Sequence, residues 1–303
     1  MIYVDNLHKQ YGRVEALSGL TFSVNEGEIY GIIGPDGAGK TSLFRILATL
    51  LLPDGGRAEV DGLDVVRDCR ELRRRIGYMP GRFSLYQDLT VEENLRFFAS
   101  VFNTSIDENY SLIKDVYCRL EPFKARRAGK LSGGMKQKLA LCCALIHAPR
   151  VLLLDEPTTG VDPVSRREFW QMLQRIRSSH GITVLVSTPY MDEASWCDRI
   201  SLAQNGCLLQ TGTPGEICES CSARLFAVRS DDMHRLLNDL KECACVTTSF
   251  SFGDSIHVTL DEAAASHTLW EYLQRRGHTG IEVKGIRPSV EDCFMSLMKG
   301  QTV

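Results

Sequence analysis

The stretch from Gly34 to Thr41 constrains the fold of this chain more than any other part of the sequence. It reads Gly-Pro-Asp-Gly-Ala-Gly-Lys-Thr and matches the pattern G-x-x-x-x-G-K-[ST] of a phosphate-binding loop. Residues 27–33 before it predict a short buried strand, and residues 41–47 after it carry apolar side chains at helical spacing. A strand, a glycine-rich loop and a helix in this order favour an α/β fold that binds a phosphorylated ligand.

The residue types of the loop indicate how it would bind a nucleotide. Glycine residues allow backbone N–H groups to reach phosphate oxygens, and the following helix N-terminus adds partial positive charge. We expect Lys40 to contact the β- and γ-phosphates of ATP and the Thr41 hydroxyl to ligate Mg²⁺. The nucleotide-binding candidates in this stretch are Gly34, Pro35, Asp36, Gly37, Ala38, Gly39, Lys40, Thr41 and Ser42.

A second motif follows more than a hundred residues later, where residues 151–154 are four aliphatic residues followed by Asp155 and Glu156. A continuous apolar run is typical of a strand buried on both faces of a parallel sheet. Acidic residues at the carboxyl end of such a strand lie where open α/β folds bind their ligands. We therefore expect Asp155 to hold Mg²⁺ through water and Glu156 to orient and deprotonate the attacking water.

Tyr11 precedes the phosphate-binding loop and has two interpretations. Its ring could stack on the purine base of a nucleotide, because aromatic faces stabilise stacked bases. Its alternative is an ordinary aromatic residue of a turn, since Gly12 follows it. We include Tyr11 among the nucleotide-binding candidates.

Composition excludes several classes of protein. The net charge of −3 and the pI of about 6.2 do not fit a nucleic-acid-coating protein. The longest apolar run, residues 139–146, is too short to cross a bilayer, which needs about 20 residues. The 11 cysteines are scattered and no signal peptide is visible, so we expect reduced thiols in the cytoplasm. The lone C-x-x-C at Cys218–Cys221 is a weak metal signal.

The last ninety residues have a different pattern from the rest. After the turn at residues 213–215 they predict a βαββαβ core, which favours a small α+β ferredoxin-like accessory domain over residues 216–303. No catalytic constellation is visible there. The predicted strands are 225–228, 246–252, 256–260 and 281–286, and the predicted helices are 231–241, 263–276 and 290–298. Earlier in the chain, residues 64–75 predict a helix, and residues 90–93 resemble a capping box that opens another one.

A third motif, Leu-Ser-Gly-Gly-Met-Lys-Gln at residues 131–137, resembles the LSGGQ signature of ATP-binding cassette (ABC) ATPases. It lies between the two other motifs, in the family's order, and residues 157–163 resemble the family's D-loop. The resemblance covers residues 1–215, and its details are similar to ATP-binding subunits of bacterial multidrug exporters, including the first cassette of tandem subunits. The 216–303 extension is also similar to this exporter group.

The resemblance implies a P-loop NTPase fold with a mixed sheet core, an antiparallel β subdomain and a helical subdomain at about residues 85–147. It implies an ATPase that uses Mg²⁺ and works as a dimer with a second cassette, identical or different. Each ATP would lie between Lys40 of one cassette and Ser132, Gly133 and Gly134 of the other, with Asp162 of the D-loop nearby. Separate membrane permease subunits would dock near Phe83, Leu85 and Tyr86, which places the chain on the inner face of the cell membrane.

Three residues depart from the family's pattern. Gly81 replaces a glutamine that helps to hold Mg²⁺ and the attacking water, and Pro189 replaces a histidine that contacts the γ-phosphate. Asp36 replaces an asparagine and adds a negative charge near the phosphates. These departures predict a degenerate, slow site whose intact Ser132 side serves the other cassette. The alternatives are a regulatory nucleotide-binding module with little turnover, and a soluble ABC ATPase outside transport.

Overall fold

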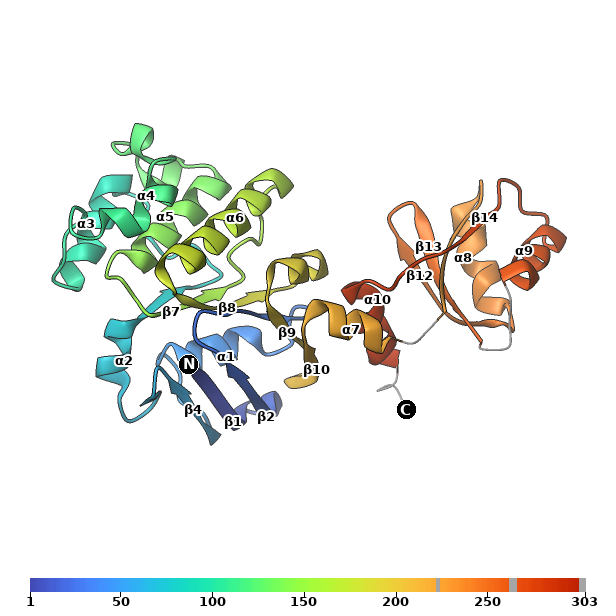
Figure 1. The fold of residues 1–303 in the computed structure, drawn as a ribbon, viewed down its shortest axis with the longest axis horizontal. Coiled ribbons are helices and arrows are strands. Elements are labelled where there is room, and N and C mark those ends of the chain that lie inside the picture. The colour runs from blue at the N-terminus through green and yellow to red at the C-terminus, as the bar shows by residue number, and fades with distance from the viewer. Residues whose placement is uncertain (222–223, 262–265, 300–303) are drawn as a thin grey trace. The chain divides into compact units, whose positions relative to one another are not determined.

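The computed structural model describes residues 1–221, 224–261 and 266–299 (Figure 1). The chain divides into two compact units, Met1–Pro214 and Gly215–Val303. The first unit contains the three motifs. The predicted helix start at Ala263 lies outside the described residues.

The first unit is organised on a six-stranded sheet of order β10-β9-β3-β8-β7-β6. Every residue of the three central strands β3, β8 and β7 is buried, which explains their continuous apolar sequences. All neighbours are parallel except β9 and β10, so the predicted mixed sheet is confirmed. The strands are β3 (Ile29–Ile33), β6 (Ile76–Met79), β7 (Val151–Asp155), β8 (Thr183–Thr188), β9 (Arg199–Gln204) and β10 (Cys207–Gly212).

A second, antiparallel sheet of order β2-β1-β4-β5 forms the predicted β subdomain. Figure 1 shows α1 (Lys40–Leu47) between this sheet and the six-stranded one. Apolar side chains of both sheets and of α1 form one buried core, so the helix after the phosphate-binding loop is fixed from two sides. The strands are β1 (Ile2–Tyr11), β2 (Val14–Val24), β4 (Gly55–Val60) and β5 (Leu63–Asp64).

The helix expected from Asp64 to Arg75 is shorter than the prediction: α2 spans Cys69–Arg75. Asp64 ends β5 instead, and its Oδ1 accepts hydrogen bonds of 2.9 Å from the backbone N–H groups of Val66 and Arg67. An aspartate that bonds to the backbone just ahead of it offers the chain an alternative to a helical turn. The start of the helix is therefore delayed by five residues.

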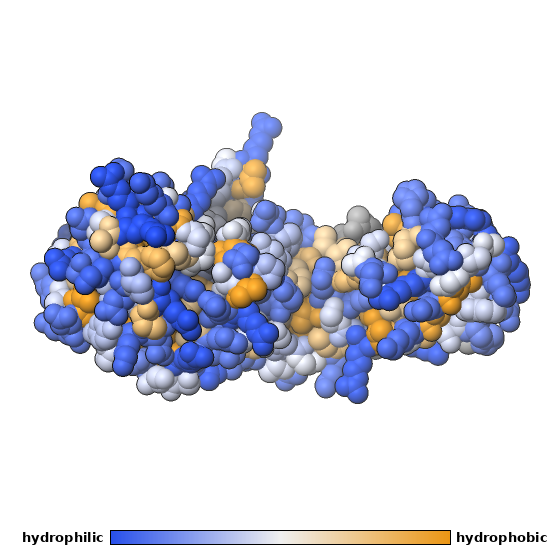
Figure 2. All heavy atoms as spheres, turned by 90° about the horizontal axis from the view of Figure 1, so that it is seen from above, coloured by the Kyte–Doolittle hydropathy of each residue, from blue (hydrophilic) through white to orange (hydrophobic). Residues whose placement is uncertain are grey.

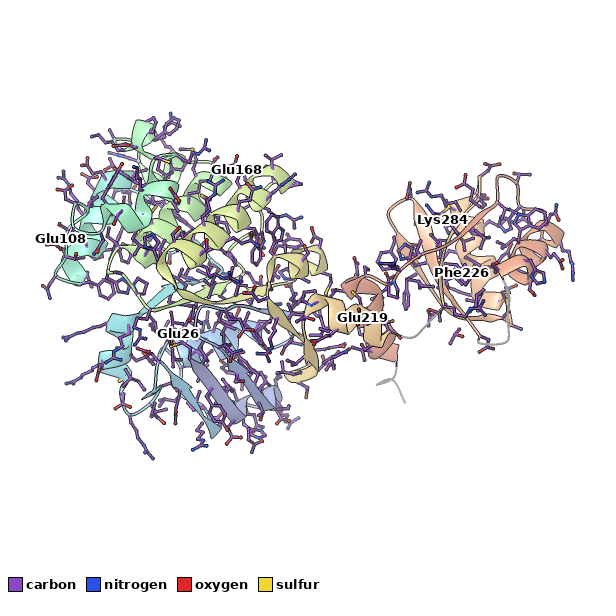
Figure 3. All side chains as sticks on the ribbon, in the orientation of Figure 1. Glu26, Glu108, Glu168, Glu219, Phe226 and Lys284 are labelled. Carbon is purple, nitrogen blue, oxygen red and sulfur yellow. The ribbon has the colours of Figure 1, made fainter. Side chains whose placement is uncertain are left out.

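The helices of residues 85–147 lie on the opposite side of the six-stranded sheet from the β subdomain (Figure 1). They are α3 (Val91–Val101), α4 (Tyr110–Tyr117) and α5 (Gly133–Leu145), with short turns η1 (Glu121–Phe123) and η2 (Ala128–Lys130). Thr90 and Glu93 form the expected capping box at the start of α3. Next to them runs α6 (Pro163–His180), whose Glu168, labelled in Figure 3, accepts a 2.7 Å bond from Lys138 of α5.

The second unit contains an antiparallel sheet of order β12-β13-β11-β14. Two helices, α8 and α9, share a buried apolar core with one face of this sheet. Phe226 and Lys284, labelled in Figure 3, lie on the neighbouring strands β11 and β14. The elements are α7 (Pro214–Ser220), β11 (Leu225–Arg229), α8 (Met233–Glu242), β12 (Val246–Phe252), β13 (Ser255–Leu260), α9 (Ser266–Arg275), β14 (Glu282–Gly285) and α10 (Val290–Lys299).

Apolar residues reach the surface in small patches separated by hydrophilic ones on the face in Figure 2. None of the helices in the described part of the chain is both long enough and apolar enough to span a membrane.

Candidate functional site

The phosphate-binding loop begins where β3 ends, and close backbone contacts fix its course. The Gly34 N–H donates to the Thr188 carbonyl at the end of β8 over 3.2 Å. A Cβ on Gly34 would lie 2.0 Å from the Ala203 carbonyl oxygen, and one on Gly39 would lie 2.2 Å from that of Ala16. Gly39 also has φ +92°, a conformation that favours glycine. These two glycines are required by the packing of the loop against β9 and β2.

Lys40 is the centre of the site. Its side chain is buried, and its ammonium donates to the carbonyls of Gly34 at 2.7 Å and Pro35 at 2.8 Å. The ammonium also lies 3.0 Å from Oε1 of Glu156. Three acceptors match the three donors of a lysine, so the cation is held at one point of the pocket. The pocket is lined by Ala16, Asp36, Gly37, Ala38, Gly39, Lys40, Thr41, Ser42 and Glu156.

Asp155 ends β7 beside this pocket, with only 1% of its surface exposed. Its Oδ1 accepts a 2.8 Å bond from the Ser187 hydroxyl of β8. Burial raises the pKa of Asp155, while hydrogen bonds from Ser187 and Thr41 act in the opposite direction. A carboxylate that is desolvated in this way is stabilised by a cation placed nearby.

Glu156 follows immediately and has a left-handed backbone with φ +50°. Its N–H donates to both oxygens of Ser187, the hydroxyl at 2.9 Å and the carbonyl at 3.1 Å. Left-handed residues other than glycine are uncommon and concentrate at functional sites, where the surrounding structure holds them. Here the turn directs the carboxylate toward Lys40, away from the end of the strand.

Two of the three departures from the family's pattern follow strands of the six-stranded sheet. A Cβ on Gly81, which comes after β6, would be 3.1 Å from the Asp155 carbonyl oxygen and 3.7 Å from the Glu156 Cβ. Pro189 follows Thr188, the last residue of β8. Gly81 therefore adjoins the two carboxylates, and Pro189 continues the strand that pairs with theirs.

The signature residues lie apart from the pocket lining. Ser132 caps α5 and accepts a 3.4 Å bond from the Met135 N–H, and it is exposed together with Gly133. A Cβ on Gly134 would lie 2.8 Å from the Ser165 hydroxyl, so glycine lets α5 approach α6 there. Asp162 caps α6, and a hydrogen bond from the Ser165 N–H lowers its pKa. Within a single chain, the signature residues and Asp162 do not line the pocket that contains Lys40.

Tyr11 borders the pocket without lining it. Its ring is 46% exposed, and its hydroxyl is 3.4 Å from the Ser42 hydroxyl in the phosphate-binding loop. The Lys9 ammonium lies 5.6 Å from the centroid of the ring, and Asp54 pairs with that ammonium at 2.9 Å. Lys9 of β1, held by Asp54, therefore packs against the Tyr11 ring beside the loop.

Two further residues of this site belong to none of the three motifs. Ser187 bonds to Asp155 and to the Glu156 backbone, but the sequence reveals it only as the end of a buried strand. Its signal was available, since a polar residue at the carboxyl end of a parallel strand points toward the ligand edge. Ala16 lines the pocket from β2, and nothing in its sequence context marks it.

An apolar groove of about 340 Å³ lies on the first unit, between the β6 end and helices α3 and α5. Of the predicted docking residues, Leu85 is buried in its wall, Phe83 is half-buried and Tyr86 is 51% exposed. The aromatic cluster predicted there is thus part core and part surface. The groove is lined by Ala48, Leu50, Arg73, Ile76, Tyr78, Met79, Pro80, Ser84, Leu85, Phe98, Val101, Phe102, Ala140, Cys143, Ala144 and His147.

Among the described residues, no group of three or more His, Cys, Asp or Glu side chains is arranged to hold a metal ion. The pair at Cys218 and Cys221 therefore gains no support as a zinc site from the described residues. Both thiols, like the other nine, are free.

Comparison with known proteins gives consistent matches. Residues 17–159 match the family model described as ABC transporter. The chain is 38% identical over 307 residues to the probable multidrug ABC transporter ATP-binding protein YbhF of Escherichia coli, covering 99% of this chain and 52% of that protein. It is 39% identical over 298 residues to the Nod factor export ATP-binding protein I of Burkholderia lata, covering 96% and 95%.

A dimeric bacterial ABC transporter cassette of known structure covers 70% of this chain, and 98% of that cassette is matched. Its sequence is 28% identical and its TM-score is 0.64. The chain spans about half the length of the Escherichia coli relative. It spans nearly all of the Burkholderia one, so the match is not confined to a shared motif. The chain belongs to the ABC transporter family of ATPases, as one of its ATP-binding subunits.

Proposed function

We propose that the chain is the ATP-binding subunit of an exporter, coupling ATP binding and hydrolysis in a pair of cassettes to substrate export by a separate membrane permease. The observation that carries the proposal is the convergence of Lys40, Asp155 and Glu156 at one sheet edge. The relatives' names, multidrug transporter and Nod factor export protein, support an exporter.

The residues at this edge fit a magnesium ion. Mg²⁺ prefers hard oxygen ligands and is commonly held by one or two protein groups together with water and substrate phosphates. The Thr41 hydroxyl and the Asp155 carboxylate would supply these oxygens, and the positive ion would stabilise the charge of the desolvated carboxylate. The bound ion would neutralise charge on the β- and γ-phosphates. Lys40 would hold the same phosphates, and Glu156 would orient the water.

The exposed position of the signature residues supports the proposal of a second cassette. Ser132 and Gly133 present an exposed helix start that has no role in the chain's own pocket. A helix N-terminus of this kind stabilises anions, so it would complete the phosphate site of another cassette. The similar solved structure is described as a dimer, which supports this arrangement. The second cassette is either another copy or an intact partner.

The chain's own site hydrolyses ATP slowly in this proposal. Gly81 has no side chain to orient water, and Pro189 has neither a side-chain donor nor an N–H group. Loss of one preorganised donor costs about 10² to 10³ in rate. Asp36 lines the pocket and is exposed, which adds a negative charge that solvent screens. A regulatory module with little turnover is the second candidate, and the same residues favour it.

The apolar groove is the proposed docking site for the permease, at the inner face of the membrane. Its wall combines buried Leu85 with Val101, which is 56% exposed. Burial of apolar surface contributes about 25 cal/mol per Å² to the free energy of binding. An apolar segment of a permease loop would therefore be stabilised by docking in this groove. The soluble class of ABC ATPase gains no support from this surface, and the proposal includes no nucleic-acid partner.

Co-purification of the chain with its permease from native membranes in detergent tests the proposal. Val101→Glu places a charge in the groove and should abolish recovery of the permease with the tagged chain. Val66→Glu is the matched control, because Val66 is 45% exposed and does not line the groove. Equal recovery of the permease with both variants would contradict docking in the groove. Recovery of RNA or DNA in place of a membrane protein would favour the soluble class.

A further inference from the structure

Glu193 is a buried carboxylate that the proposed hydrolysis does not use. It lies in the short turn η3 (Met191–Trp196), with 2% of its surface exposed. Its Oε2 accepts two hydrogen bonds, from the Thr158 hydroxyl at 3.0 Å and the Thr188 hydroxyl at 2.5 Å. Its Oε1 is enclosed without a hydrogen-bond partner. Buried polar atoms are nearly always satisfied, so an enclosed orphan oxygen requires an explanation.

The two hydroxyls belong to segments with different tasks. Thr158, itself 1% exposed, lies in loop 157–162, which runs from Glu156 to the Asp162 cap of α6. Thr188 ends β8, and its carbonyl accepts the Gly34 N–H of the phosphate-binding loop. Oε2 of Glu193 therefore links two segments. One is loop 157–162, and the other is the end of β8, which bonds to the phosphate-binding loop. Hydroxyl–carboxylate bonds are among the strong hydrogen bonds of proteins.

The unsatisfied Oε1 of Glu193 lies near the guanidinium of Arg166 but beyond hydrogen-bond distance. Arg166 on α6 approaches Oε1 to 3.9 Å, while it pairs with Asp192 at 3.1 Å and lies 4.3 Å from the centroid of the Tyr190 ring. A shift of loop 157–162 and the start of α6 by about 1 Å would convert this contact into a direct hydrogen bond. The site thus has an unsatisfied acceptor and a donor within reach of it.

We propose that Glu193 is a positioning residue that makes loop 157–162 follow the state of the chain's own phosphate-binding loop. A ligand that draws the β8 end and Gly34 together moves Thr188. Glu193 passes this movement to Thr158, and Arg166 then closes on Oε1. The inference rests on the proposed function only in requiring that ATP binds at Lys40.

Hydrogen exchange of the full chain tests this coupling without any need for turnover. The probe is adenylyl imidodiphosphate, a non-hydrolysable ATP analogue, with Mg²⁺. In the unmodified chain, we expect the probe to slow amide exchange in residues 34–44 and in residues 157–164. Thr158→Val keeps the shape of the side chain but removes the hydroxyl. It should leave the protection of residues 34–44 within about twofold and reduce that of residues 157–164 at least about fivefold, since the link of Oε2 to the loop is lost.

Two further variants separate coupling from mere structural damage. Thr158→Ser retains the hydroxyl and should restore the response of residues 157–164. Ser195→Ala removes an exposed hydroxyl from the same turn, where it bonds only to the Asp192 carbonyl, and should change neither segment. If residues 157–164 stay protected in Thr158→Val, or if both segments lose protection together, the coupling is wrong. No protection of residues 34–44 in the unmodified chain would instead contradict ATP binding itself.

Discussion

The phosphate-loop side and the signature side of the cassette differ in how much of a nucleotide site one chain supplies. On the first side, Lys40 and Asp155 are buried, and their partners belong to the same unit. Lys40 contacts Gly34 and Pro35 of the phosphate-binding loop and Glu156 just after β7, and Asp155 contacts Ser187 of β8. On the second side, Ser132 and Gly133 are exposed, and the Ser132 hydroxyl only caps its own helix. One folded chain therefore completes the phosphate pocket but leaves its signature residues at the surface, where the proposed second cassette would bind.

The departures from the family's pattern fall on one side only. Gly81 adjoins the two carboxylates of the folded pocket, and Pro189 follows the neighbouring strand β8, whereas the signature retains its serine and both glycines. If the two sides serve different pockets, damage to each should have separate consequences.

The largest effect is expected from Ser132→Arg in a mixed dimer of this chain with an intact cassette. A cation and a bulky side chain at the exposed helix start would replace the cap and obstruct the phosphate site of the partner. We expect the ATPase rate of the mixed dimer to fall about 1000-fold, while Glu156→Gln in this chain lowers it less than about threefold. Steady-state phosphate release measures both. Equal losses would show that the two sides serve the same pocket.

Lys40→Ala tests the folded side alone. Removal of the ammonium takes away the charge-assisted contact with the phosphates and leaves Glu156 as an unpaired acid near them. The Kd for ATP should rise about 100-fold, equivalent to about 2.7 kcal/mol. Calorimetric titration of the purified chain gives the value. Lys138→Ala is the control, because that lysine pairs with Glu168 away from the pocket, and its Kd should stay within about twofold.

Much of the folded side could be predicted from sequence, because its residues come in continuous runs. The stretch 34–41 and the run ending at Asp155 and Glu156 carry their own local signals. Glu193 could not be assigned, because its partner Thr158 is 35 residues away in the chain. The role of Ser187 was indicated only by its place near the carboxyl end of a strand, since Glu156 and Asp155 are 31 and 32 residues away. The start of α2 was misplaced because one side chain, Asp64, bonds to two backbone N–H groups that a periodicity argument ignores.

Tyr11→Ala tests whether the nucleotide site of the folded side extends to the base of ATP. The ring adjoins Ser42 and is exposed enough to stack on a base. Stacking contributes about 1 to 3 kcal/mol per base, so the Kd for ATP should rise about tenfold. The affinity for inorganic tripolyphosphate, which has no base, should not change. A similar loss for both ligands would mean that Tyr11 supports the phosphate-binding loop and not the base.

The smallest effect concerns His147, just beyond the α5 helix that carries the signature. Burial lowers the pKa of His147, and its Nε2 bonds to the Ile76 carbonyl at 2.9 Å. The unfolded chain therefore binds more protons below about pH 6.5, and stability falls as pH drops through that value. In His147→Gln, the fall in Tm between about pH 7.5 and about pH 5.5 should be about 2 °C smaller. An identical fall would contradict the assignment to His147.

Steady-state ATPase of the purified chain, measured beside the double variant Gly81→Gln with Pro189→His, tests whether the chain's own site is degenerate. A Cβ at Gly81 would lie 3.1 Å from the Asp155 carbonyl oxygen, so the variant requires a small local shift of the backbone there. We expect the unmodified chain to turn over no faster than Glu156→Gln. The double variant should turn over at least about 100-fold faster, and Glu156→Gln should abolish the gain. Turnover of the unmodified chain near 10 s⁻¹, about the median for enzymes, and its loss in Glu156→Gln would contradict a degenerate site.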